Sequence, residues 1–150
     1  MSASPRLDRL PCAAGTLRRA SRSLARLYDV HLSRAGLTTT QFSILRTLQR
    51  RGGAASLAEL ADELVFERTS LYRALAPLRR ARLLTVRPGA DRRAREVVLT
   101  ARAAPCIAAA MPHWIAAQRA VVGDVGPAAW QNLAARLRHL TTVARAALPE

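Results

Sequence analysis

Apolar residues recur every three to four positions over most of this chain, a spacing that predicts amphipathic helices. The first predicted helix covers residues 12–35, and Gly36 ends it. Its arginines at positions 18, 19, 22 and 26 fall mostly off the apolar stripe. A second helix follows and stops at Gly52-Gly53, with an inward stripe formed by Phe42, Leu45 and Leu48.

Two further helices are predicted close together in the middle of the chain. Ser56 and Glu59 have the spacing of a capping box, so a short helix should start at this point. The next helix runs from about residue 67 to 81 and faces inward with Leu71, Leu75 and Leu78. Pro77 lies inside it and should kink or loosen its last turn, because proline lacks a backbone donor.

The hydrophobic period then changes from helical to extended. Residues 83–87 and 96–99 are apolar and rich in leucine and valine, which is typical of strands. Residues 88–91 (Pro-Gly-Ala-Asp) have turn chemistry. The pattern therefore predicts a hairpin whose loop carries Arg92, Arg93 and Arg95.

Two long helices close the chain. Thr100 can cap the first of them, Pro112 should bend it, and residues 123–127 form a break before the last helix at about 128–147. The last helix has a narrow apolar stripe, which suits a seam between helices, either within the core or between two subunits. The stripe consists of Leu133, Leu137, Leu140, Ala144 and Leu148.

The order of these elements predicts a mainly α winged helix-turn-helix with a two-stranded β wing. A length of 150 residues fits one domain, and the high content of alanine and leucine favours helices. A short helix, a tight connection and a second helix form a helix-turn-helix, and the basic hairpin that follows is the wing. A DNA major groove about 12 Å wide admits one α-helix, so the second helix would present its polar side to bases.

Charge supports a nucleic-acid partner. The chain carries a formal net charge of +14, and all its basic residues are arginine. Half of this net charge lies within residues 66–102. Such an excess favours an anionic partner, with nucleic acid ahead of an anionic membrane. On the predicted recognition helix, Arg68, Thr69, Tyr72 and Arg73 fall on the outer face, and Arg93 at the hairpin tip could enter a minor groove.

Together these segments resemble the MarR family of winged-helix regulators. Residues 37–42 with Leu45 resemble the family's entry to its second helix, and residues 57–61 resemble the first helix of its reading head. Residues 68–73 resemble its recognition helix. Asp91-Arg92-Arg93, followed by Leu99-Thr100, resembles its wing, and this D-x-R feature is the most specific match.

The resemblance implies a homodimer that binds a pseudo-palindromic operator, as a repressor released by a small effector such as an aromatic molecule. Within one MarR-type domain spanning 1–150, residues 12–36 and 101–148 would form dimerisation helices from both termini. Residues 37–100 would form the DNA-binding region. The implied DNA contacts, with Asp91 orienting the wing, are Arg68, Thr69, Ser70, Tyr72, Arg73, Asp91, Arg92, Arg93 and Arg95.

The remaining candidate residues predict little chemistry of their own. Cys12 lies near a helix N-terminus, where a thiol is more reactive, so it is a candidate redox sensor. Cys106 is expected to be a buried apolar residue. His31, His113 and His139 lack metal-site spacing, and no enzyme motif is present, so we expect no metal, no cofactor and no catalysis. No apolar segment is long enough to span a membrane, so we expect a cytoplasmic protein.

Several alternatives remain open at this point. The sequence also fits a cysteine-based redox-sensing regulator, with or without DNA binding. A sequence-indifferent nucleic-acid packing protein would need only the arginine excess. Trp114 and Trp130 are expected in the core or at the dimer seam, although His113 or Trp114 could instead line an effector pocket.

Overall fold

The computed structural model describes residues 6–91 and 94–149. The described chain forms six α-helices, two short 3-10 helices (Leu7–Arg9 and Ser33–Ala35) and one three-stranded antiparallel sheet. The helices are α1 (Ala13–Leu32), α2 (Thr39–Arg50), α3 (Leu57–Leu64), α4 (Arg68–Arg80), α5 (Ala103–Val125) and α6 (Pro127–Ala146). The strands are β1 (Ala54–Ser56), β2 (Leu84–Pro88) and β3 (Arg95–Leu99).

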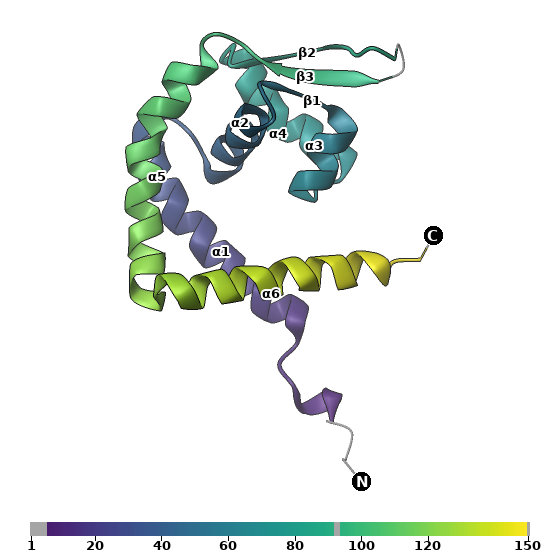
Figure 1. Cartoon of the computed structure of the whole chain (residues 1–150), viewed down its shortest axis with the longest axis vertical. Coiled ribbons are helices and arrows are strands. Elements are labelled where there is room, and N and C mark those ends of the chain that lie inside the picture. The colour runs from purple at the N-terminus through teal and green to yellow at the C-terminus, as the bar shows by residue number, and fades with distance from the viewer. Residues whose placement is uncertain (1–5, 92–93, 150) are drawn as a thin grey trace.

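The molecule consists of a compact head and a frame of long helices (Figure 1). Helices α2, α3 and α4 lie under the sheet and form the head, while α5 runs down one side of the molecule beside α1. At Gly126 the chain turns sharply, and α6 passes below the head. In the last turn of α6, Arg145 forms an ion pair with the Asp62 carboxylate of α3 and donates to the Asp62 carbonyl at 3.1 Å.

Both capping boxes hold the start of a helix in the head. At α3, the Ser56 hydroxyl accepts from the Glu59 amide at 3.1 Å, and the Glu59 carboxylate accepts from the Ser56 amide at 2.8 Å. Thr38 and Gln41 make the same reciprocal pair at the start of α2. The predicted box at Ser56 is therefore confirmed, and each box satisfies two amides that would otherwise lack a partner.

The core lies where the head meets the upper parts of α1 and α5. The predicted inward stripes of α2 and α4 are buried: Leu45 and Leu71 have no exposed surface. Val97 of the sheet and Ile107 of α5 complete this cluster. In α6, all of whose residues the structure describes, no side chain is buried, and Leu133, Leu140 and Val143 are 43%, 37% and 49% exposed.

The sheet has one strand more than the sequence pattern predicts. Its order is β1-β3-β2, and Ala54 pairs with Val98 while Ser56 pairs with Glu96. Because β1 has only three residues, it carries too short a pattern to be recognised by alternation. Its pairing joins the wing directly to the start of α3.

Two helix boundaries also differ from the prediction. Arg102, not Thr100, is the N-cap of α5. The Thr100 hydroxyl donates to the Arg82 carbonyl at 2.7 Å, just after α4, and its oxygen accepts from the Arg102 amide at 3.3 Å. Helix α5 continues through Gly123 to Val125, and the break is at Gly126, whose φ of 89° suits glycine. Helix α4 continues past Pro77 to Arg80.

Val65, which connects α3 to α4, has a backbone conformation that is unfavourable for a β-branched side chain. Its φ is 55° and its ψ is 46°, in the left-handed region. The Phe66 amide donates to the Ala61 carbonyl at 2.8 Å, and the Val65 amide donates to the Asp62 carbonyl at 3.3 Å. This pattern ends a helix in the way that usually selects glycine.

We therefore expect Val65→Gly to stabilise the protein by about 0.5–1 kcal/mol. Relief of about 1–2 kcal/mol of left-handed strain exceeds the backbone entropy lost by glycine. Little burial is lost, because Val65 is 59% exposed. Thermal unfolding followed by circular dichroism tests this expectation, with Ala58→Gly inside α3 as the control that should destabilise by about 1 kcal/mol. Equal losses in both variants would contradict the strain argument.

Candidate nucleic-acid interface

Helices α3 and α4 form a helix-turn-helix whose second helix turns its polar side outward. Leu71, Leu75 and Leu78 anchor α4 in the core and are at most 1% exposed. Five predicted contact residues are exposed on the N-terminal half of α4: Arg68, Thr69, Ser70, Tyr72 and Arg73. Glu67 precedes them as the N-cap and makes no side-chain capping bond, so the first amides of α4 remain available.

The wing is a regular hairpin next to this helix-turn-helix. Val86 pairs with Val97, and Arg87 forms an ion pair with Glu96 across the strands at 2.8 Å. At the turn, the Ala94 amide donates to the Asp91 carbonyl at 2.8 Å. Asp91 and Arg95 are exposed, whereas Arg92 and Arg93 lie outside the described residues.

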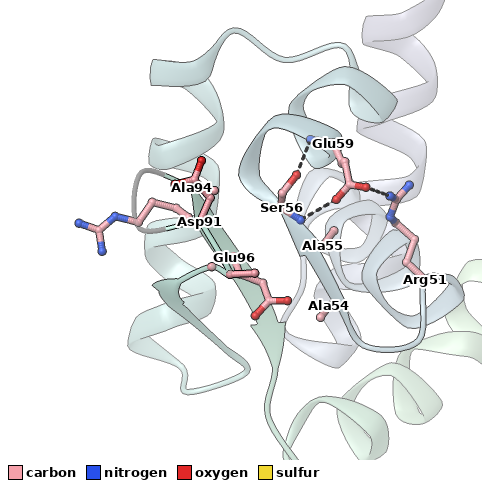
Figure 2. Close-up of a pocket in the computed structure, with 11 residues that line it drawn as sticks. Arg51, Ala54, Ala55, Ser56, Glu59, Asp91, Ala94 and Glu96 are labelled. Carbon is pink, nitrogen blue, oxygen red and sulfur yellow. Dashed lines mark hydrogen bonds and ion pairs between the residues drawn. The ribbon is translucent and has the colours of Figure 1, made fainter.

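Two open hollows lie between the wing and the helix-turn-helix. One, of about 480 Å³, brings Arg68 of α4 together with Asp91 and Arg95 of the wing. The other, of about 540 Å³, lies between the wing and the segment where β1 enters α3 (Figure 2). Three of the predicted residues, one from α4 and two from the wing, thus share one surface hollow.

Two arginines at the C-terminal end of α2 form a cluster of ion pairs with α3, which the sequence did not predict. Arg51 contacts Glu59 at 2.8 Å and Glu63 at 3.0 Å, and Arg50 contacts Glu63 at 3.3 Å (Figure 2 shows the Arg51–Glu59 pair). The backbone amide and the hydroxyl of Ser56, followed by Arg51, lower the pKa of the Glu59 carboxyl. Because α2 and α3 meet only after folding, no spacing along the chain indicates this cluster.

Glu59 should make stability depend on pH. A carboxyl whose pKa is lowered on folding stabilises the protein above its unfolded pKa, and this contribution disappears as the pH falls through the lowered value. We expect Glu59→Gln to lower the melting temperature at pH 7, with a difference that shrinks toward pH 3. Melting curves across this range test it, with Asp8→Asn in the N-terminal arm as control. A difference that is constant with pH would rule out the carboxylate charge as its cause.

A third cavity lies at the junction of the head and the long helices. It has a volume of about 490 Å³, and we call it the junction pocket. The Tyr28 hydroxyl donates to Gln118 beside it, and burial raises the pKa of Tyr28. The rings of Phe42 and Trp114 pack at 6.3 Å. Its lining consists of Leu17, Ala20, Ser21, Leu24, Ala25, Tyr28, Thr39, Phe42, Ser43, Trp114, Val121, Trp130 and Leu137.

The two cysteines lie in different environments, and both are free thiols. Cys12 is exposed as the N-cap of α1, where its Sγ accepts from the Gly15 amide at 3.4 Å. Cys106 is half-buried against the core, and burial raises the pKa of its thiol. Among the described residues, no group of His, Cys, Asp and Glu side chains is arranged to hold a metal ion. No described helix is both long and apolar enough to cross a membrane.

Comparison with known proteins agrees with this geometry. A sequence profile described as a winged helix DNA-binding domain matches residues 37–103. The structure of the M. tuberculosis transcriptional regulator MosR in complex with DNA is 37% identical, covers 91% of this chain and 98% of its own, and has a TM-score of 0.82. No curated protein sequence matches the chain.

Two more distant structures share the fold. AbsC, a MarR family transcriptional regulator from Streptomyces coelicolor, is 23% identical over 90% of this chain and 93% of its own, with a TM-score of 0.78. BpsR from Bordetella bronchiseptica, whose DNA binding is regulated by 6-hydroxynicotinic acid, is 23% identical over 87% and 94%, with a TM-score of 0.73.

A helix-turn-helix with an outward polar helix, followed by a basic hairpin, defines a winged-helix DNA-binding protein, and the matched profile is of this class. The relatives are transcriptional regulators and not enzymes. The chain belongs to the MarR family of winged-helix transcriptional regulators.

Proposed function

We propose that the protein is a homodimeric repressor whose α4 reads the major groove of a pseudo-palindromic operator. The observation that carries this proposal is the exposed polar face of α4, with Arg68 and Arg73 on a helix anchored by buried leucines. Arginine suits both base edges and phosphates, since its planar fork donates two parallel hydrogen bonds. Thr69, Ser70 and Tyr72 are proposed as the neighbouring contacts.

The wing is proposed to follow the adjacent backbone and minor groove. Arg95 is exposed at the turn end of the wing. The hollow that it shares with Arg68 supports the view that helix and wing act on one stretch of DNA. Asp91 is proposed to orient the turn. Arg92 and Arg93 are proposed as contacts from the sequence alone.

Gel-shift binding to the upstream intergenic DNA, against scrambled DNA of equal length, tests the repressor. We expect a preference of at least a hundredfold at about 150 mM salt. Log affinity should fall with log salt at a slope of about −7 if about eight phosphates are neutralised. Equal affinity for both DNAs would instead favour a sequence-indifferent packing protein, and a slope near zero would reject DNA binding.

Arg68→Ala should weaken this specific binding about tenfold to a hundredfold, as expected for the loss of one bidentate contact. The matched control is Arg138→Ala, which removes an exposed arginine from α6, away from the proposed interface. Gel shifts of the two variants on the same fragment compare them. Equal weakening in both would show that net charge, and not the α4 face, determines affinity.

We propose that dimerisation uses α6 together with α1 and α5. The apolar stripe predicted on the last helix is largely exposed, and its leucines line one face of α6 as a continuous apolar strip. The N-terminal half of α1 is exposed as well, including Leu17. A second copy of the chain is the proposed partner for these surfaces, as the family resemblance implies.

An effector is proposed to act at the junction pocket, which lies between the helices proposed for dimerisation and the DNA-binding head. A molecule bound there contacts α1, α2, α5 and α6 together, so it can favour one relative placement of the heads. BpsR offers a parallel in a related fold. Redox control through Cys12 is a second candidate, supported by its exposure at the start of α1.

A further inference from the structure

The wall of the junction pocket carries no formal charge. Its lining, which lies wholly within the described part of the chain, is made of aliphatic and aromatic side chains and four hydroxyls. Because an ion loses hydration on entering such a cavity, it needs a partner of opposite charge there. No arginine lines this pocket, although arginine is the chain's most abundant polar residue.

The N-terminus of α2, which lies beside this pocket, already binds a carboxylate of the chain itself. An anion entering the pocket would be attracted to the first turn of α2, from which Thr39, Phe42 and Ser43 line the wall. The Asp29 carboxylate holds this position: it accepts from the Thr39 amide at 2.6 Å and from the Thr39 hydroxyl at 2.7 Å. A built-in carboxylate thus satisfies the helix terminus and would repel a second one.

Neutral hydrogen-bonding groups are nevertheless available. The hydroxyls of Ser21 and Ser43 form no hydrogen bond within the described chain, and each can donate or accept. The Tyr28 hydroxyl uses its proton on Gln118, so its oxygen can only accept a further bond. Two tryptophans and a phenylalanine supply flat surfaces for an aromatic ring.

We propose that the junction pocket selects an uncharged aromatic molecule bearing a neutral hydrogen-bonding group, such as an amide or hydroxyl, and rejects aromatic carboxylates. The proposal rests on the effector site proposed above and specifies its ligand class. Asp29 is the residue that determines this selectivity.

The chain's only two tryptophans, Trp114 and Trp130, both line this pocket, so intrinsic fluorescence reports its occupancy. We would titrate the full-length protein at pH 7.5 with 3,5-dichlorobenzamide and with 3,5-dichlorobenzoate, which differ in charge but little in shape. The amide should bind at least tenfold more tightly than the benzoate. Ala20→Phe, which fills part of the pocket, should weaken the amide at least tenfold.

Asp29→Asn should reduce the ratio of amide affinity to benzoate affinity at least fivefold, mainly by improving benzoate binding. The start of α2 should stay in place, because the asparagine oxygen can still accept from Thr39. Asp8→Asn, which removes an exposed carboxylate from the N-terminal arm, away from this pocket, should leave that ratio of affinities unchanged. Benzoate binding as tightly as the amide, or neither probe binding at millimolar concentration, overturns the proposal. Amide binding that does not release DNA supports this selectivity and overturns the effector role, so the two failures are distinguishable.

Discussion

Replacing both Leu133 and Leu140 by glutamate should convert the protein to a monomer and lower its operator affinity at least a hundredfold. Both side chains lie on one face of α6 and are 43% and 37% exposed in the single chain. Two carboxylates buried at a dimer seam would lack partners, and the cost of several kcal/mol is of the order of the stability of a subunit interface. A single head would then bind with half the contacts.

The matched control is Gln131→Glu with Thr142→Glu. These residues lie on the opposite face of α6, are exposed, and change the net charge by the same amount. Sedimentation equilibrium and gel shifts compare the two double variants. A dimer that survives the leucine replacements, or is lost equally in the control, would show that this face of α6 is not the subunit seam.

Leu71→Ala should destabilise the protein by about 2–5 kcal/mol, a large part of the stability of a domain of this size. Leu71 has no exposed surface and anchors α4 from within the core. Its loss leaves a cavity beneath the proposed reading helix, so DNA binding should fall even at temperatures where the chain stays folded. Urea unfolding measures the change.

Leu148→Ala is the control for this prediction, because Leu148 is 70% exposed at the end of the chain and should change stability by less than about 0.5 kcal/mol. Both variants remove the same atoms, so the difference between them isolates burial. A Leu71 variant as stable as the Leu148 variant would mean that α4 is held by contacts other than its leucine stripe.

The sequence predicted the elements whose signals are local. The capping box at Ser56 and the leucine stripe of α4 each lie within one or two helical turns, so periodicity and spacing sufficed. The exposed face of α4 followed from the same stripe, since residues between the buried leucines must point outward. The segments that resemble the MarR family's reading head lie in these same two helices.

Features made by distant segments were not predictable. Strand β1 is defined by its pairing with β3, about 40 residues away, and the Thr100 hydroxyl donates to the carbonyl of Arg82, which lies before the hairpin. Likewise, Asp29 faces the start of α2 only because α1 packs against it. When the residues of an ion pair or a pocket wall come from different helices, they follow no regular spacing along the chain.

The short strand β1 limits which insertions the proposed operator can tolerate. Through β1, the wing is hydrogen-bonded to the segment that starts α3, and the tight α3–α4 connection links that segment to α4. A base pair inserted between the proposed contacts of α4 and those of the wing would shift one of them by about 3.4 Å and rotate it about the duplex axis. These connections limit how far the wing can move relative to α4. We therefore expect an insertion within a half-site of the proposed operator to abolish binding, because helix and wing could not both reach their proposed contacts.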